Sequence, residues 1–227
     1  MLVVLSSEKG LTMLSGVSYT ELRHRGIASR KPVNMKPDFG TYHYSTARSS
    51  EEIRNELRPV FIDVFRQLPF LKSKKIRILD IGCGLGFLSC LCAEFYPNAN
   101  VLGVDTFAHS SLKRSSLEKA GENARISGFS DRIVFQKGDI TETDFRGEDF
   151  DLFVSNLVYH NLGRKRFRAY ERLASWVPKG SYVVLGELFF GHESDIKFLS
   201  RLFGSVKEVP IGGVGGAYRL LVLSKPR

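Results

Sequence analysis

Residues 78–87 read Ile-Leu-Asp-Ile-Gly-Cys-Gly-Leu-Gly-Phe, a short apolar run followed by three glycines at alternate positions. The apolar run predicts a buried strand, and the apolar stretch from Leu88 to Phe95 predicts a helix directly after the glycines. Glycines let the backbone turn tightly and let a ligand approach it closely. The first turn of the helix offers free N–H groups and a partial positive charge. The stretch therefore predicts a strand–turn–helix unit suited to a ligand with an anionic group.

Outward from this unit, candidate strands alternate with helical patterns. Short apolar runs predict strands at residues 76–79, 101–104, 133–135, 152–154, 182–185, 206–209 and 218–223, and longer periodic or polar stretches predict helices at 49–68, 88–95, 109–127, 164–177 and 196–203. Such alternation predicts a three-layer α/β/α, Rossmann-like fold with a mostly parallel sheet. Only about eight residues join the last two strands, too few for a crossover helix, so the C-terminal strand is expected to pair as an antiparallel hairpin.

The N-terminal part of the chain is the least regular. Residues 1–48 hold scattered glycines, prolines and basic residues without a sustained period, so we interpret them as an N-terminal extension and candidate lid, and residues 49–227 as one domain. Ser49 and Glu52 fit a capping box at the start of the first helix. Pro59 predicts a kink in that helix, or its division into two short helices.

The spacing of the glycines separates the classes of nucleotide-type cofactor. Dinucleotide-binding turns follow G-x-G-x-x-G, but Gly82, Gly84 and Gly86 give G-x-G-x-G, and Phe87 occupies the position of the third Gly or Ala. That bulk argues against a dinucleotide-dependent oxidoreductase, and the Gly-Lys-Ser/Thr of a Walker A loop is absent. With Asp80 ahead of the glycines, the stretch resembles motif I of the class I S-adenosylmethionine-dependent methyltransferases, D/E-x-G-x-G-x-G. A tight turn that binds no ligand is the alternative.

The resemblance covers about residues 53–227 and implies S-adenosyl-L-methionine as the cofactor. By resemblance, Asp105 at the tip of the second strand accepts from the ribose hydroxyls, and Asp139 and Ile140 contact the adenine. The residues alone leave open a helix cap for Asp105 and an ordinary loop role for Asp139. The cofactor-binding residues implied in full are Asp80, Gly82, Cys83, Gly84, Gly86, Asp105, Thr106, Asp139, Ile140, Ser155 and Asn156.

The catalytic residues are less clearly marked than the cofactor site. A methyl group on a sulfonium is already a good electrophile, so such an enzyme acts mainly by positioning donor and acceptor. A general base is needed only when the acceptor must lose a proton. His160 and Tyr159, which follow the fourth strand, are the candidates, and a structural role is the alternative for each. Two further stretches are weaker candidates, with an ordinary surface role as the alternative: His192 with Glu193 as site residues, and Tyr44 or Arg48 as lid residues.

The acceptor is predicted to be a small molecule. The segment Asp151–Asn161 resembles the small-molecule form of the family's motif IV and lacks both the Asn/Asp-Pro-Pro-Tyr and the Pro-Cys signatures. Arg164, Arg168 and Arg172 are spaced by four as one basic ridge, and residues 23–36 are also basic, so an RNA or protein acceptor is the second hypothesis. A non-catalytic cofactor-binding protein is the third.

Composition sets outer limits on these hypotheses. The 227 residues are 43% hydrophobic and 25% charged, as in an ordinary globular domain, and the net charge of +9 is compatible with an anionic partner. No apolar run approaches the roughly 18 residues of a membrane span, so a cytoplasmic protein is expected. The three cysteines lack partners at metal-ligand spacing, so no metal site is predicted and all three are interpreted as core residues. The oligomeric state is left open.

Overall fold

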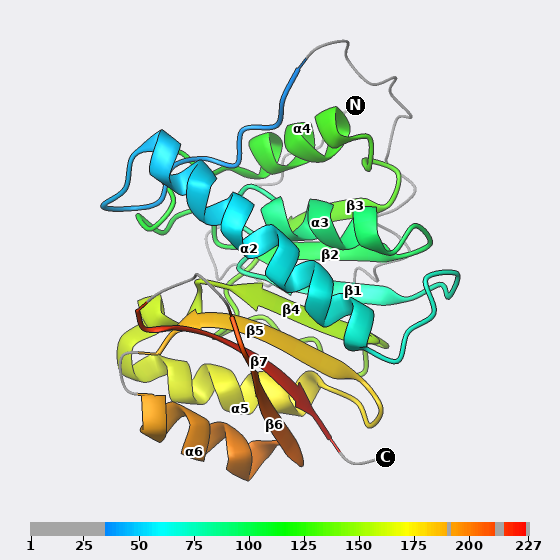
Figure 1. Ribbon diagram of the computed structural model, residues 1–227, viewed down its shortest axis with the longest axis vertical. Coiled ribbons are helices and arrows are strands. Elements are labelled where there is room, and N and C mark those ends of the chain that lie inside the picture. Colours follow the sequence, from blue (N-terminus) through cyan, green and yellow to red (C-terminus); the bar gives the residue numbers. More distant parts are fainter. Residues whose placement is uncertain (1–34, 190–191, 212–215, 226–227) are drawn as a thin grey trace, which may run out of the picture.

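The computed structural model describes residues 35–189, 192–211 and 216–225 (Figure 1). In this part of the chain, seven strands form one sheet in the order β3-β2-β1-β4-β5-β7-β6. The strands are β1 (Arg77–Ile81), β2 (Asn100–Asp105), β3 (Ile133–Lys137), β4 (Leu152–Asn156), β5 (Tyr182–Leu188), β6 (Ser205–Val209) and β7 (Tyr218–Ser224). Strands β1 to β5 pair in parallel, and β7 lies antiparallel between β5 and β6. The predicted Rossmann-like fold with an antiparallel C-terminal strand is therefore confirmed.

Helices cover both faces of the sheet. The helices α2 (Ala47–Gln67), α3 (Phe87–Phe95) and α4 (Leu117–Ser127) pack on one face, and the 3-10 helix η1 (Tyr159–Lys165), α5 (Arg166–Trp176) and α6 (His192–Leu202) pack on the other (Figure 1). This covering explains why the central strands are buried along nearly their whole length instead of at alternate residues. The edge strand β6 is more exposed. The C-terminal ends of the parallel strands are left as the edge at which ligands bind in such folds.

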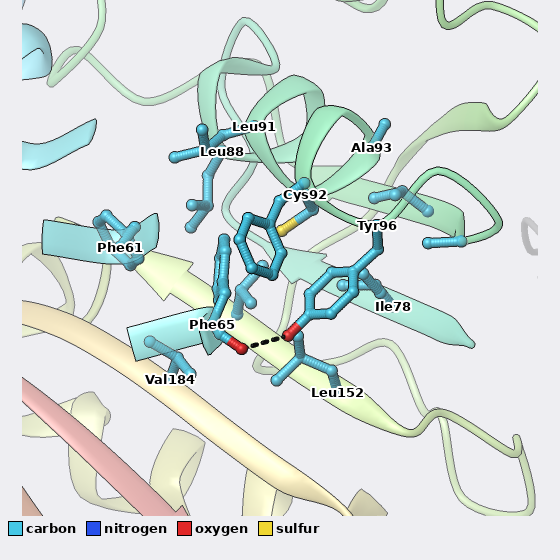
Figure 2. Close-up of a cluster of buried hydrophobic side chains, with 14 of the residues drawn as sticks. Phe61, Phe65, Ile78, Leu88, Leu91, Cys92, Ala93, Tyr96, Leu152 and Val184 are labelled. Atoms are coloured by element: carbon cyan, nitrogen blue, oxygen red, sulfur yellow. Dashed lines mark hydrogen bonds between the residues drawn. The ribbon is translucent and has the colours of Figure 1, made fainter. Parts of the chain in front are cut away.

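Each face of the sheet has its own apolar core. On the α2 side, Phe65 packs against Phe95 and Tyr96, with ring centroids 5.6 and 5.7 Å apart. The Tyr96 hydroxyl donates to the Phe65 carbonyl oxygen at 3.0 Å, so its polar end is satisfied inside the core (Figure 2). The three cysteines are buried thiols, as expected. No helix in the described residues is both long and apolar enough to cross a bilayer.

Three details of the predicted helices are wrong. The cap of α2 is Thr46, whose Oγ1 accepts from the Ser49 N–H at 3.1 Å, so the predicted capping box at Ser49 lies inside the helix. Pro59 lies within one helix, not between two. Helix α4 begins only at Leu117, because the Ser116 side chain caps it, and residues 109–116 precede it as a loop.

The predicted basic ridge is interrupted, although Arg164 and Arg168 are both exposed. Arg164 lies in η1, ahead of α5. The guanidinium of Arg172 turns toward the segment after β3, where Nε donates to the Ile140 carbonyl at 3.1 Å and Nη2 donates to the Glu142 carbonyl at 3.0 Å. Arg172 therefore ties α5 to that segment instead of presenting a cation to a polyanion. The basic residues at 23–31 lie outside the described residues.

Candidate functional site at the ends of β1, β2, β4 and β5

The glycine-rich turn after β1 requires a backbone that only glycine adopts readily. Gly82, Gly84 and Gly86 have φ of 68°, 52° and 85°, all in the left-handed region. Gly86 is also the N-cap of α3, so the turn ends where the helix exposes its first N–H groups. The turn is therefore built as a cradle of backbone, as the sequence predicts.

Side chains also lie very close to this turn. A Cβ atom on Gly82 would be 2.2 Å from Val158, one on Gly84 would be 2.8 Å from Leu112, and one on Gly86 would be 2.7 Å from the Phe135 ring. Each distance is shorter than real Cβ contacts show. Both the backbone conformation and the packing therefore exclude larger residues from the turn.

Asp105, at the end of β2, joins the second strand to the glycine turn. Its Oδ2 accepts from the Gly84 N–H at 2.9 Å, and its Oδ1 accepts from the Phe107 N–H at 2.7 Å. A carboxylate has about four acceptor sites, so both oxygens retain capacity for hydroxyl donors. Thr106 is half-buried beside it. The predicted ribose contact thus remains a prediction, but the carboxylate is held at the place that the prediction requires.

Asp80 lies deeper than a direct cofactor ligand would. Its side chain is 1% exposed and accepts a hydrogen bond from the Ser89 hydroxyl of α3. Burial raises the pKa of Asp80 to about 7, an effect that the nearby charge of Asp105 reinforces and the bond from Ser89 opposes. Cys83 is buried as well. Asp80 is therefore placed to anchor the turn on α3, and its contact with the cofactor stays a prediction.

The segment after β3 contributes two residues of different character. Asp139 is half-buried, and its Oδ1 accepts from the Thr141 N–H and hydroxyl, each at 2.7 Å. Ile140 is buried in the core of the α5 face. The local bonds of Asp139 suit the ordinary loop role left open above, and its contact with adenine stays a prediction.

The two predicted residues at the end of β4 also differ in burial. Ser155 is buried, and its hydroxyl donates to the Ile81 carbonyl at 3.0 Å, which ties β4 to β1. Asn156 is half-buried, and its Oδ1 accepts from the Tyr218 hydroxyl of β7 at 2.8 Å. Of this pair, only Asn156 retains polar atoms for a ligand.

A histidine–carboxylate pair follows at the end of β4 and β5. The Nδ1 atom of His160 lies 2.7 Å from Oε2 of Glu187, whose side chain is 1% exposed. The Glu187 carboxylate also accepts from the backbone N–H groups of Val158, Tyr159 and His160, so it fixes the whole turn into η1. His160 keeps 17% of its side chain exposed. The pair thus combines a buried orienting carboxylate with an imidazole that solvent and ligand can reach.

A cavity of about 80 Å³ lies beside this pair. Its walls include His160 and Glu187, and opposite them Arg166 donates to both oxygens of Asp195 at 2.7 and 3.1 Å. Asp195 is 2% exposed, so this ion pair is largely shielded from water. The cavity is small but polar, and it lies at the same edge of the sheet as the glycine turn.

The glycine cradle and the strand order together agree with the comparison to known families. A family model described as a methyltransferase domain matches residues 72–188, which include the turn, Asp105, His160 and Glu187. The chain belongs to this family. It thus contains a methyltransferase domain, in a fold shared with a proposed S-adenosylmethionine-dependent methyltransferase of known structure.

Known proteins resemble this methyltransferase over parts of its length. A tRNA1(Val) (adenine(37)-N6)-methyltransferase of Vibrio vulnificus is 35% identical over 88 residues, 39% of this chain and 34% of that protein. A malonyl-[acyl-carrier protein] O-methyltransferase of Legionella pneumophila is 34% identical over 97 residues, 43% of this chain and 31% of that protein. The chain thus spans about a third of these relatives. A proposed S-adenosylmethionine-dependent methyltransferase of Methanococcus maripaludis has the same fold, with a TM-score of 0.59, 16% identity and coverage of 89% and 98%.

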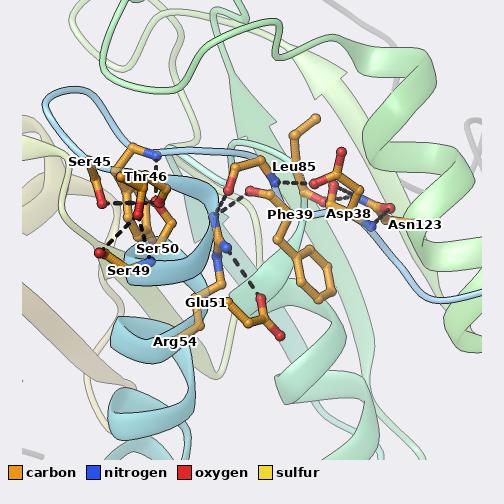
Figure 3. Close-up of polar contacts among 12 residues, drawn as sticks. Asp38, Phe39, Ser45, Thr46, Ser49, Ser50, Glu51, Arg54, Leu85 and Asn123 are labelled. Atoms are coloured by element: carbon orange, nitrogen blue, oxygen red, sulfur yellow. Dashed lines mark hydrogen bonds and ion pairs between the residues drawn. The ribbon is translucent and has the colours of Figure 1, made fainter.

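In this methyltransferase, residues 35–46 form a strap that crosses the glycine turn. Asn123 of α4 bonds both the N–H and the carbonyl of Asp38, at 2.9 and 2.8 Å, and also the Leu85 carbonyl at 2.9 Å (Figure 3). Arg54, buried in α2, donates to the carbonyls of Phe39 and Gly40 (Figure 3). The strap therefore packs on the glycine turn, and its role as a lid stays a prediction.

The individual residues suggested for the lid point elsewhere. Tyr44 is 97% exposed, and Arg48 pairs with Glu52 in solvent with 89% of its side chain exposed.

Tyr159, the second candidate for the general base, is fully buried and stacks on Tyr170 with ring centroids 4.9 Å apart. Burial raises the pKa of the Tyr159 hydroxyl above its ordinary value. The structure thus makes Tyr159 the weaker of the two base candidates. The side chain of His192 lies outside what the structure describes.

Two functional candidates were missed in the sequence. Glu187 is an acid inside an otherwise apolar strand, and that exception was a usable signal. Tyr218 gave no signal, because an aromatic residue at the start of a strand is ordinary. Only the pairing of β5 with β7 brings it toward Asn156.

Proposed function

We propose that this protein transfers the methyl group of S-adenosylmethionine to a small-molecule acceptor whose accepting atom loses a proton, with His160 as the general base. The observation that carries this proposal is the His160–Glu187 pair. A base oriented by a buried carboxylate is of little use to an acceptor that has no proton to lose. The pair therefore favours hydroxyl or amine acceptors over carboxylic acids, which are already ionised at neutral pH.

The residues at the sheet edge suit the cofactor. Bound S-adenosylmethionine supplies an electrophilic methyl carbon on a sulfonium. The glycine turn allows close approach of the adenosyl group, and Asp105 retains acceptor sites for its ribose hydroxyls. Thr106, Asp139 and Ile140 would line the adenosine, and Asn156 would meet the aminoacyl end. The strap of residues 35–46 would then act as the lid over the turn.

The tautomer of His160 follows from its neighbour. An ionised carboxylate only accepts hydrogen bonds, so the imidazole Nδ1 carries the proton that faces Glu187, and the basic lone pair is on Nε2. In the reaction, a lone pair of the acceptor atom forms the bond to the methyl carbon while the carbon–sulfur bond breaks. Nε2 takes the acceptor proton, and Glu187 stabilises the resulting imidazolium. The products are the methylated acceptor and S-adenosylhomocysteine.

The preference for a small acceptor rests on motif IV and on the surface. The last two residues of β4 and the two that follow read Ser-Asn-Leu-Val, without the Asn/Asp-Pro-Pro-Tyr of many amino-group methyltransferases. The basic ridge that would have supported RNA is interrupted, because Arg172 bonds carbonyl groups of its own chain. The relatives named above act on a tRNA and on an acyl-carrier protein, so similarity to them does not choose the acceptor.

The test combines binding with turnover. Calorimetry with S-adenosylmethionine, S-adenosylhomocysteine and NADH should show binding of the two adenosyl ligands only. A panel of phenols, carboxylic acids, amines and bulk tRNA should then be incubated with labelled methyl donor and either wild-type protein or His160→Gln. We expect label on a small acceptor with the wild type and a loss of about 100-fold or more with the variant.

Three outcomes would contradict the proposal. Label on tRNA alone would support the second hypothesis. Adenosyl binding without transfer to any class would support a non-catalytic protein. Equal turnover by His160→Gln would remove the histidine from the chemistry.

A further inference from the structure

Three neighbouring strands meet at one point of the cofactor edge. Asn156 of β4 pairs in register with Gly186 of β5, and Gly186 pairs with Leu220 of β7. The side chain of Tyr218 reaches back over β5, so that its hydroxyl donates to Oδ1 of Asn156 at 2.8 Å. Tyr218 is 3% exposed, so this bond is shielded from water.

The glycine in the middle strand is what permits this contact. A Cβ atom on Gly186 would lie 2.1 Å from the Tyr218 hydroxyl oxygen and 2.9 Å from Oδ1 of Asn156. Any other residue at 186 would displace one of the two. The left-handed conformation is not the reason for this glycine, because Gly186 does not have a positive φ. The absent side chain is therefore the feature that lets tyrosine and asparagine meet.

The structure has the Asn156 amide with Oδ1 toward the Tyr218 hydroxyl. With Oδ1 turned to the tyrosine, Asn156 offers a ligand the two N–H donors of Nδ2, and no acceptor for them occurs among the residues that the structure describes. A pair of donors complements a carboxylate and not an ammonium or a sulfonium. The aminoacyl end of S-adenosylmethionine carries both a carboxylate and an ammonium, so the orientation selects between them.

We propose that Tyr218 is a positioning residue that holds the Asn156 amide so that its Nδ2 donors bind the carboxylate of the cofactor's aminoacyl end. The proposal rests on the proposed cofactor site. Tyr218 itself does not touch the cofactor, and Gly186 serves only to make room for it.

Equilibrium binding of S-adenosylhomocysteine tests this without any turnover. Tyr218→Phe should weaken binding about five- to tenfold, as expected for one lost orienting hydrogen bond. Tyr96→Phe is the matched control, because it also removes a buried tyrosine hydroxyl bond but far from the cofactor edge, and it should bind like the wild type. Asn156→Asp should weaken binding more than Asn156→Ala, because a carboxylate would then face a carboxylate.

Two further measurements separate positioning from a merely structural role. The double variant Tyr218→Phe/Asn156→Ala should bind no more weakly than Asn156→Ala alone, since the tyrosine acts only through the amide. 5′-Methylthioadenosine, which lacks the aminoacyl end, should bind all these proteins equally.

The proposal is overturned by additive losses in the double variant, by equal losses with 5′-methylthioadenosine, or by Asn156→Asp binding as well as the wild type. A wild-type protein that binds S-adenosylhomocysteine but transfers no methyl group would overturn the proposed function alone. Failure of the wild type to bind either ligand would overturn both.

Discussion

The two halves of the cofactor edge are built on different principles. At β1 and β2, the site is mostly backbone, with three glycines in left-handed conformations and an aspartate that accepts from the N–H of one of them, Gly84. At β4 and β5, the site is made of side chains that are distant in sequence, such as His160 with Glu187 and Asn156 with Tyr218. A site made of backbone groups needs residues that are contiguous in the sequence, whereas a site made of side chains can combine residues from distant parts of the chain. The first half can therefore be predicted from a short sequence motif, and the second half cannot.

The largest expected effect tests the backbone half. Gly82→Ala must adopt a φ of 68° and also place its Cβ 2.2 Å from Val158, so we expect binding of S-adenosylhomocysteine to fall at least 100-fold by calorimetry. Gly180→Ala is the matched control, because Gly180 also has a left-handed φ, 87°, but its added Cβ would meet nothing within 4 Å. Gly180→Ala should cost about 1 kcal/mol of stability and leave binding unchanged. Equal binding losses in both variants would show that the strain of a left-handed φ, and not the close contact with Val158, weakens binding.

The next effect tests the side-chain half. His160→Gln should reduce methyl transfer about 100-fold or more, with S-adenosylhomocysteine binding retained, because the imidazole acts on the acceptor. Glu187→Gln should lose less turnover than the histidine variant, since the amide can still accept from the imidazole N–H but does not stabilise the imidazolium. Single-turnover rates with the labelled donor measure both. A loss of cofactor binding in His160→Gln would instead show that the histidine helps to bind the cofactor, as the residues at β1 and β2 are expected to do.

A smaller effect concerns the meeting point of β4, β5 and β7. Gly186→Ala should weaken S-adenosylhomocysteine binding by about tenfold, because the new methyl group separates Tyr218 from Asn156. Gly121→Ala, which adds a methyl group with nothing within 4 Å, should bind like the wild type. If Gly186→Ala binds normally, the side-chain half tolerates displacement and the contrast between the two halves is weakened.

The smallest effect concerns the buried carboxyl beneath the glycine turn. The pKa of Asp80 is raised by burial to about 7 in the folded protein, above about 4 in the unfolded chain. The folded state therefore holds this proton more tightly, so the contribution of Asp80 to stability is complete below about pH 4 and is lost as the pH rises to about 7.

Asp80→Asn should consequently remove that part of the pH dependence. Urea unfolding at a series of pH values would show wild-type stability falling between pH 4 and 7 relative to the variant, by a few kcal/mol at most. Parallel pH profiles for the two proteins would mean that the carboxyl stays ionised inside the fold.

The sequence was most reliable where local residues determine local structure. The strands predicted at 76–79 and 101–104 lie within two residues of the bounds of β1 and β2, because their apolar runs must be buried on both faces. Helix boundaries were less reliable, as Thr46 and Ser116 show. Several serines and threonines near each end could cap, and the sequence does not say which one does.

By itself the sequence determined the fold class, the antiparallel last strand and the cofactor turn. Each of these follows from the order and spacing of neighbouring residues. Only the tertiary structure decided that Glu187 orients His160, that Tyr218 turns Asn156, and that Arg172 is occupied by carbonyl groups. The first two contacts depend on β5 lying between β4 and β7, and the third depends on α5 packing against the segment after β3. Residues separated by 27 to 62 positions are brought within hydrogen-bonding distance only when the sheet forms.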